Sequence, residues 1–347
     1  MPWHVQAQRL VLALAIGAVG GYLFKWLTLP LPWMLGSMSF VTIATLTGLK
    51  TRIPPHFRSI MITVLGIMLG SAFTPAIIAR MGEWALTISG LALWMLLAGG
   101  SGLIYFRKVA GYDRITAFFS ATPGGLNEMV IVGGAMGGDD RTISLTHASR
   151  IMLVVFTIPL WYRLSGAVPA VSPATGIGLL ELPWTDVVAL AACAVVGALG
   201  ARALRIPAAF LVGPMVLSAI VHVSGLTTSK PPDPLVAFAQ VAIGAAIGGR
   251  FTGMAPGNMA KIAGHAIVSA IVMLALTVAF SLALARATGY PLPAIVLAFA
   301  PGGLAEMSLI ALALSVDAAF VASHHIARIV MVVTLAPAVF RLSHRKT

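Results

Sequence analysis

The same pattern of residues occurs twice along this chain, at a constant offset of 177 or 178 positions. Its most distinctive part is Pro-Gly-Gly-Leu-x-Glu-Met, which begins at Pro123 and again at Pro301. Other matched pairs are Gly36 with Gly213, Gly66 with Gly244, Gly70 with Gly248, Asp139 with Asp317, His147 with His325 and Arg150 with Arg328. Apolar helices resemble one another by composition, but composition alone does not match Glu, Asp, His and Arg in register. The chain therefore contains an internal duplication.

The duplication predicts two repeats, at residues 1–163 and 185–347. Between them, residues 164–184 contain Pro169, Pro173 and Pro183. Because proline interrupts a helix, this stretch is interpreted as a Pro-rich linker.

Each repeat consists of apolar runs of the length that a membrane span requires. Hydrophobic residues make up 59% of the 347 residues and charged residues only 9%, whereas soluble domains carry about 25% charged residues. A span needs about 20 mostly apolar residues. Runs of this kind predict helices at 9–26, 32–49, 58–78, 84–106, 115–137 (broken), 144–161, 185–204, 208–225, 234–253, 262–287, 292–313 (broken) and 320–342. The fold class predicted is an all-α polytopic membrane protein, located in the inner (plasma) membrane with the lipid bilayer as its partner.

The net charge of +12 does not indicate nucleic-acid binding, because the basic residues are scattered singly between apolar runs. Such residues orient membrane spans, since cytoplasmic loops collect Lys and Arg. In the first repeat, one set of alternate loops, such as the one at Lys50, is enriched in Lys and Arg. In the second repeat the other set of alternate loops is enriched, such as the one at Arg205. This change of phase predicts two inverted repeats, with about ten transmembrane helices, two broken or re-entrant elements and both termini cytoplasmic. Tryptophans near span ends are interpreted as interfacial anchors; they are Trp26, Trp33, Trp84, Trp161 and Trp184.

The Pro-Gly-Gly motifs predict a break in a membrane-embedded helix. Proline lacks an N–H group and glycine loses the most entropy on ordering. Irregular backbone at membrane depth is tolerated only inside protein or along a wet cavity, and paired breaks in two repeats indicate a transporter's binding site. The candidate substrate- or ion-binding residues are Pro123, Gly124, Gly125, Asn127, Glu128, Pro301, Gly302, Gly303 and Glu306. Glu128 and Glu306 fall in the first turn after each break, where a carboxylate can accept a proton, coordinate a cation or cap the restarted helix.

A second pair of polar residues follows each break. His147 and Arg150 lie three positions apart, as do His325 and Arg328, so each pair shares a helix face. Two interpretations stay open for the arginines: ion pairs from Arg150 to Glu128 and from Arg328 to Glu306, or contact with substrate. The histidines can couple a proton. The four residues are predicted coupling or ion-pair residues.

Nothing in the sequence predicts a metal, a cofactor or a catalytic residue. Cys193 is the single cysteine and lies in an apolar run, so no thiolate cluster is expected. The sequence also lacks His-x-His and Glu-x-x-His ligand pairs.

The doubled Pro-Gly-Gly-Leu-x-Glu-Met motif, with His-x-x-Arg behind each copy, resembles the duplicated membrane AbrB family of Gram-negative bacteria over essentially the whole chain. Members of this family are often labelled ammonia monooxygenases or regulators of gene expression. The family is similar in fold to cation/proton antiporters and anion transporters, which have inverted repeats and broken helices and often form homodimers. The resemblance thus implies three functions: a secondary transporter of a small solute or ion, a membrane regulator of gene expression, or a membrane monooxygenase. The residue pattern favours the transporter.

Overall fold

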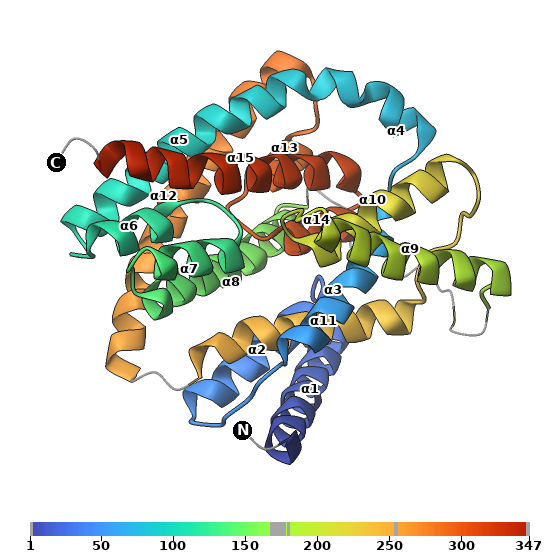
Figure 1. The fold of residues 1–347 in the computed structure, drawn as a ribbon, viewed down its shortest axis with the longest axis horizontal. Helices are drawn as coiled ribbons and strands as arrows, with labels where there is room; N and C mark the ends of the chain where they lie inside the picture. The colour runs from blue at the N-terminus through green and yellow to red at the C-terminus, as the bar shows by residue number, and fades with distance from the viewer. Residues whose placement is uncertain (1–2, 167–177, 179–180, 253–255, 345–347) are drawn as a thin grey trace. The chain divides into compact units, whose positions relative to one another are not determined.

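The computed structural model describes residues 3–166, 178, 181–252 and 256–344, and these contain helices but no strand. Most of the predicted linker, residues 167–177 and 179–180, lies outside the described residues. Ten α-helices in the described chain have 15 residues or more, and shorter helices lie between them (Figure 1). The all-helical prediction is confirmed.

The helices follow the predicted apolar runs closely. Those of the first repeat are α1 (Trp3–Trp26), α2 (Pro32–Leu46), α3 (Pro55–Gly70), α4 (Pro75–Arg80), η1 (Met81–Trp84), α5 (Ala85–Lys108), α6 (Arg114–Ala121), α7 (Leu126–Ala135) and α8 (Asp140–Leu164). Those of the second are α9 (Trp184–Ala203), α10 (Ala209–Val223), α11 (Asp233–Gly248), η2 (Gly249–Phe251), α12 (Pro256–Thr288), α13 (Leu292–Phe299), α14 (Leu304–Ala313) and α15 (Ala318–His344). Proline occupies the first or second position of several helices, where its missing N–H has no partner to lose.

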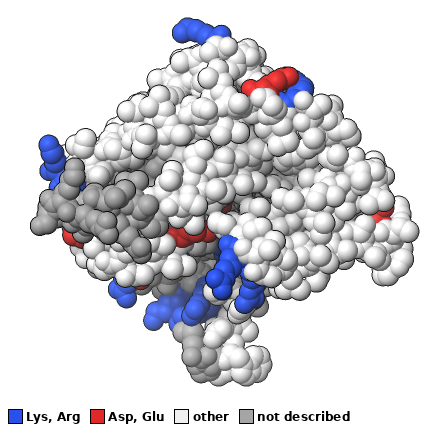
Figure 2. All heavy atoms as spheres, turned by 45° about the horizontal axis from the view of Figure 1, so that its top comes forward, with Lys and Arg blue, Asp and Glu red and all other residues white. Residues whose placement is uncertain are grey.

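Seven helical segments in the described chain are long and apolar enough to cross a membrane. They are Trp3–Trp26, Pro75–Lys108, Asp140–Leu164, Trp184–Ala203, Asp233–Phe251, Gly257–Thr288 and Ala318–Leu335. Helices α2, α3 and α10 are apolar but shorter. Large apolar side chains such as Leu96 and Ile131 are exposed, and the face in Figure 2 carries few charged residues. Apolar surface on this scale suits lipid rather than water, so the chain is a polytopic membrane protein.

The duplication extends to unusual backbone conformations. Leu31 and Ala208, which are 177 positions apart, both have positive φ (46° and 52°) and precede α2 and α10. Gly48 and Gly225 have φ of 94° and 74° at the ends of the same two helices, where the left-handed region favours glycine. The two repeats therefore fold alike locally.

The described chain forms two compact units, and each draws helices from both repeats. Unit 1 comprises residues 1–81, 159–253 and 308–319. Inside it, α2 packs on α11 and α3 packs on α10. Gly66 and Gly70 of α3 lie against the backbone of α10, and Gly244 and Gly248 of α11 lie against the backbone of α2. These glycines serve close helix packing, as small residues do in membrane proteins.

Unit 2 comprises residues 82–158, 254–307 and 320–347. It contains α5, α6, α7 and most of α8 from the first repeat, together with α12, α13, the first turn of α14 and nearly all of α15 from the second; the rest of α14 belongs to unit 1. Part of its core is a cluster of Phe119, Met129, Ile143 and Val332. Val332 lies on α15 of the second repeat, so the two repeats share one core in this unit.

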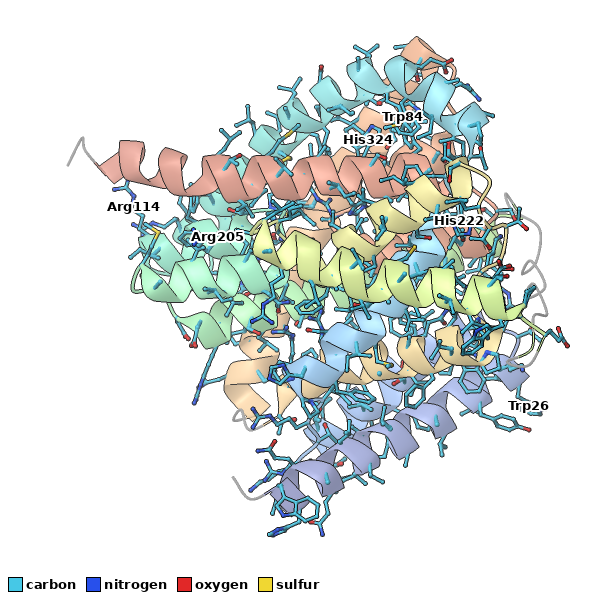
Figure 3. All side chains as sticks on the ribbon, turned by 45° about the vertical axis from the view of Figure 1, so that its right-hand side comes forward. Trp26, Trp84, Arg114, Arg205, His222 and His324 are labelled. Carbon is cyan, nitrogen blue, oxygen red and sulfur yellow. The ribbon has the colours of Figure 1, made fainter. Side chains whose placement is uncertain are left out.

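One predicted interfacial anchor is wrong. Trp26, Trp161 and Trp184 are exposed near helix ends, as expected of anchors. Trp84 is instead only 1% exposed. Its indole N–H donates to the Tyr290 hydroxyl at 2.9 Å, and its ring lies edge-on to Phe320, near His324 (Figure 3). An internal hydrogen-bond partner makes burial of this indole favourable.

Candidate functional site

Both Pro-Gly-Gly motifs break a helix in the structure. Helix α6 ends at Ala121 and α7 begins at Leu126, while α13 ends at Phe299 and α14 begins at Leu304. Thr122 and Ala300 have extended backbone at the end of each first half-helix. The predicted breaks at Pro123 and Pro301 are confirmed, and both lie in unit 2.

The glycines of each break allow close contacts with neighbouring side chains. A Cβ added at Gly124 would lie 2.6 Å from a methyl group of Val332 on α15, and one at Gly302 would lie 2.6 Å from the terminal methyl of Met307. Pro123 and Pro301 are buried beside them. The first break is thus packed directly against a helix of the second repeat.

The two glutamates fold back over the glycine that precedes their own helix. A Cβ added at Gly125 would clash with the Glu128 carboxylate, and one at Gly303 would clash with the Glu306 carboxylate. Each glutamate is the third residue of its helix, the position from which a carboxylate reaches back to a helix N-terminus. Glu306 is only 6% exposed, whereas Glu128 is half-buried. The two breaks thus share one arrangement but differ in solvent access.

The arginines bind the opposite side of each break. Arg328 donates from Nη1 to the Ala300 carbonyl and from Nη2 to the Gly302 carbonyl, both at 2.7 Å. Arg150 donates from Nη1 to the Ser120 carbonyl and from Nη2 to the Thr122 carbonyl, both at 3.4 Å, so its acceptors lie two positions earlier in the repeat than those of Arg328. A cation at the C-terminal end of a half-helix offsets its partial negative charge. The guanidinium groups therefore bind backbone carbonyls, and both interpretations from the sequence, ion pairs with Glu128 and Glu306 or contact with substrate, stay predictions.

Each histidine holds its neighbouring arginine in place. Nε2 of His147 lies 2.8 Å from the Phe119 carbonyl, and Nε2 of His325 lies 2.9 Å from the Leu297 carbonyl. A carbonyl only accepts, so Nε2 carries the proton and Nδ1 is free to accept. Nδ1 then accepts from Nη2 of the arginine, at 2.8 Å in the first repeat and 2.5 Å in the second. A second proton on Nδ1 would point at the guanidinium, so this geometry suits a positioning role better than proton coupling.

The two arginines interact with each other across the repeats. Each is 3% exposed, and they are near enough for mutual electrostatic repulsion. Nε of both has no hydrogen-bond partner. Arg150 also contacts Met273 of α12, whose sulfur lies 3.9 Å from Nη1. Unit 2 thus brings the predicted His-Arg pairs of both repeats together.

Known proteins match the chain over nearly its whole length. The family model described as "Transition state regulatory protein AbrB" matches residues 33–344. This chain belongs to the AbrB family. A Bacillus subtilis (strain 168) relative named "Uncharacterized protein YhjN" is 29% identical over 358 aligned residues, which cover 95% of this chain and 92% of the relative. An Escherichia coli (strain K12) relative named "Putative regulator AbrB" is 25% identical over 322 aligned residues, which cover 90% of each protein. No solved structure gives a significant match.

Asn127 and Asp139, two other polar residues that the sequence places at or after the first break, have different surroundings in this AbrB-family chain. Asn127 is exposed, whereas its counterpart in the second repeat, Ala305, is buried. Asp139 caps α8, because its carboxylate accepts from the amides of Arg141 and Thr142 at 3.0 and 3.3 Å. Among the described residues, no group of three or more His, Cys, Asp or Glu is placed to hold a metal ion.

Sequence reasoning missed the residue that fixes the start of α6. Asp113 accepts from the amides of Ile115 and Thr116, both at 2.9 Å. Partial burial alone would raise the pKa of Asp113, but hydrogen bonds from Thr116 and Ile115 lower it overall. An Asp three residues before a helical threonine is a recognisable N-cap signal. This cap fixes the N-terminal end of α6, and Arg150 binds the carbonyls at the C-terminal end of the same half-helix.

Proposed function

We propose that this AbrB-family protein is a secondary transporter of a small solute or ion. One observation carries the proposal: unit 2 contains two repeat-related helix breaks, each with a carboxylate over the break and a buried His-Arg pair behind it. Paired interrupted helices of this kind form the binding sites of transporters. Buried ionisable residues within membrane spans are costly and usually functional.

The division into units supports the same proposal. Unit 2 contains every candidate site residue, whereas the packing of unit 1 rests on glycines with backbone contact. Such packing suits a rigid scaffold. Glu128 and Glu306 are the proposed groups that exchange places with the solute or its coupling ion.

Removing both carboxylate charges is expected to reduce transport strongly. Proteoliposomes would be loaded with the small-molecule fraction of a cell extract, and the compounds exchanged across the membrane would be identified by mass spectrometry. For any compound that the wild type exchanges, Glu128→Gln with Glu306→Gln should lower the initial rate at least about tenfold, equivalent to about 1.4 kcal/mol. Glu83→Gln, at an exposed glutamate on η1, is the matched control. An unchanged rate in the double variant would remove both glutamates from the site.

The inverted orientation of the repeats has its own test. Lys50 and Thr228 are exposed residues in corresponding loops of the two repeats. Inverted repeats place Lys50 in the cytoplasm, with both termini, and Thr228 outside the inner membrane. In a Cys193→Ser background, a membrane-impermeant maleimide added to intact cells should label Thr228→Cys but not Lys50→Cys. Equal labelling of both positions would mean that the copies run parallel.

The name of the Escherichia coli relative favours a second candidate, a membrane regulator of gene expression. A transporter whose solute affects regulation would give the same phenotype. Expression profiles separate the two, because a direct regulator should keep its effect in the Glu128→Gln, Glu306→Gln double variant and a transporter should not.

A further inference from the structure

We infer that the coupling ion of this transporter is a proton, and that it binds to Nε2 of His324 in unit 2. The inference rests on the proposed transport function and names the ion that drives it. Glu128 and Glu306 are then the groups that exchange places with the solute.

His324 lies on α15 and is enclosed by residues of η1, α5 and α13 in unit 2. Its side chain is 0% exposed. The ring of Phe320, one turn earlier on α15, has its centroid 4.0 Å from that of the imidazole. The ring centroids of Trp84 on η1 and Phe299 on α13 are both 6.3 Å away (Figure 3). Aromatic rings at about this distance attract a cation. These three rings, the aromatic cage, therefore offset part of the cost of a charged imidazole.

The hydrogen bonds of this imidazole suit both of its protonation states. Nδ1 lies 2.8 Å from the Phe320 carbonyl, which only accepts, so Nδ1 carries a proton. Nε2 lies 2.8 Å from the Thr87 hydroxyl, which in turn lies 2.8 Å from the Trp84 carbonyl. A hydroxyl donates one hydrogen bond and also accepts. When His324 is neutral, Thr87 donates to Nε2. When Nε2 carries a proton, Thr87 accepts from it and donates to the Trp84 carbonyl.

Binding a proton at Nε2 therefore needs only the rotation of one hydroxyl. The proton comes from water, forms the Nε2–H bond and gives the imidazole one positive charge, and no N–H or O–H of the pair is left without an acceptor. Full enclosure makes a charge costly, so the described conformation holds the neutral form. We place the route from water at Tyr290, which accepts from the Trp84 indole and is half-buried.

The charged and titratable groups around the aromatic cage lie on several elements. On α15, His325 interacts electrostatically with the caged imidazole, and Arg328 is the cation bound to His325. Helix α13 has no charged residue, and those of α5 are in its last turn. At the adjoining ends of η1 and α12, Glu83 and Arg286 are exposed, and Tyr290 is the titratable residue next to the cage. Exposed charges are screened by water, so Thr87 and the aromatic rings are the groups that hold the proton.

The other enclosed histidines have different surroundings. The described chain has three histidines with a fully enclosed side chain, His147, His324 and His325. In His147 and His325, Nδ1 accepts from an arginine, so a second proton would face a guanidinium. In His324 the corresponding second proton would face a hydroxyl that can accept it. Proton coupling is therefore assigned to His324.

The first repeat does not contain a copy of this site. The residue that corresponds to His324 is Thr146, and the residue of the second repeat that corresponds to Thr87 is His265. His265 is half-buried, and its Nδ1 lies 3.0 Å from the Tyr105 hydroxyl instead of a threonine. We therefore expect one proton for each solute.

A pH difference should then drive accumulation of the solute. Proteoliposomes would receive the small-molecule fraction of a cell extract, with equal potassium and valinomycin on both sides to hold the membrane potential at zero. For one proton per solute, a compound that the wild type exchanges should reach a concentration ratio of about tenfold per pH unit, because one pH unit corresponds to about 1.4 kcal/mol. Protein-free vesicles give the passive distribution of each compound.

His324→Gln should separate coupling from exchange. The glutamine amide can still bond to Thr87 but cannot bind a proton, so this variant should exchange the same compounds at equal pH and reach a ratio of about one across a pH difference. His265→Gln is the matched control and should accumulate them as the wild type does. Accumulation by His324→Gln equal to that of the wild type overturns the inference. Loss of accumulation in both variants contradicts the assignment to His324.

The hydroxyl of residue 87 has its own pair of variants. Thr87→Ser keeps the hydroxyl and should accumulate solute, whereas Thr87→Val keeps the shape without the hydroxyl and should not. Thr277→Val is the control for loss of a buried hydroxyl, because Thr277 donates to the Met273 carbonyl at 2.8 Å within α12. Equal accumulation by the Thr87→Ser and Thr87→Val variants would mean that Thr87 has only a packing role and would contradict the proposed switch.

The outcomes distinguish this inference from the proposed function. If the wild type exchanges compounds but a pH difference drives none of them, the protein is a transporter and the proton inference fails. If no compound crosses, the transport proposal fails, and ¹⁵N NMR of histidine-labelled protein tests the proton site. The signal missing from His324→Gln should then show a proton on Nδ1 alone at neutral pH and on both nitrogens after reversible acidification. A signal that stays unchanged until the protein unfolds overturns the inference.

Discussion

Arg328→Ala is expected to lower the free energy of unfolding by about 3 kcal/mol and to abolish solute exchange. The guanidinium donates two hydrogen bonds of 2.7 Å, to the carbonyls on either side of Pro301, and a third bond to His325. A hydrogen bond from a charged donor contributes about 1.5–3 kcal/mol, and losing the donor leaves buried carbonyls unsatisfied. The end of α13 would then lose the cation that offsets its partial charge. Thermal unfolding in detergent measures the stability loss, and proteoliposome exchange measures the functional loss.

Two comparisons make this expectation specific. Arg150→Ala should destabilise less, because its own carbonyl bonds, to Ser120 and Thr122, are 3.4 Å long. Arg202→Ala, at an exposed arginine in the last turn of α9, should change stability by less than about 0.5 kcal/mol. Equal loss in all three variants would show that Arg328 has no special role at the break.

Several features of this site follow from local sequence, because they depend on residues close together in the chain. Pro159 of α8 and Pro214 of α10 lie inside continuous helices, so proline alone does not mark a break. At Pro123 and Pro301 two glycines follow the proline, and this combination made the breaks predictable. The three-residue spacing of His147 and Arg150 places them on one helix face, and the structure joins them by a 2.8 Å hydrogen bond. The glutamates at the first turn after each break were likewise predictable from their register.

The partners of the arginines were not predictable, for a physical reason. Arg328 binds main-chain carbonyls, and every residue has a carbonyl, so no side-chain pattern marks the acceptor. Because the sequence shows only side chains, it suggested two other partners for this arginine, the Glu306 carboxylate or a substrate. Burial of Trp84 was missed likewise, since its partner Tyr290 is 206 positions away. The composition of the two units also depends on contacts between repeats, such as α3 with α10, that no local pattern specifies.

Gly213→Ala is expected to destabilise the scaffold of unit 1 by about 2–3 kcal/mol, because an added methyl overpacks a tight contact. A Cβ at Gly213 on α10 would clash with the Gly197 carbonyl of α9 and with the Ala201 methyl group. Backbone cannot rotate away as a side chain can, so the two helices must separate. The corresponding pair in the first repeat, Gly20 and Gly36, makes the same backbone contact between α1 and α2.

A second glycine on α9 supplies the matched control for that substitution. Gly200 has nothing within 4 Å of an added Cβ, so Gly200→Ala should be neutral or stabilise α9 by about 0.5–1 kcal/mol, since alanine loses less backbone entropy in a helix. Thermal unfolding of both variants in the same detergent compares the two effects directly. If Gly213→Ala and Gly200→Ala unfold at the same temperature, the close approach of α9 and α10 is not what holds this part of unit 1 together. A difference in the predicted direction would instead mean that the glycines retained in both repeats set the spacing of the scaffold helices.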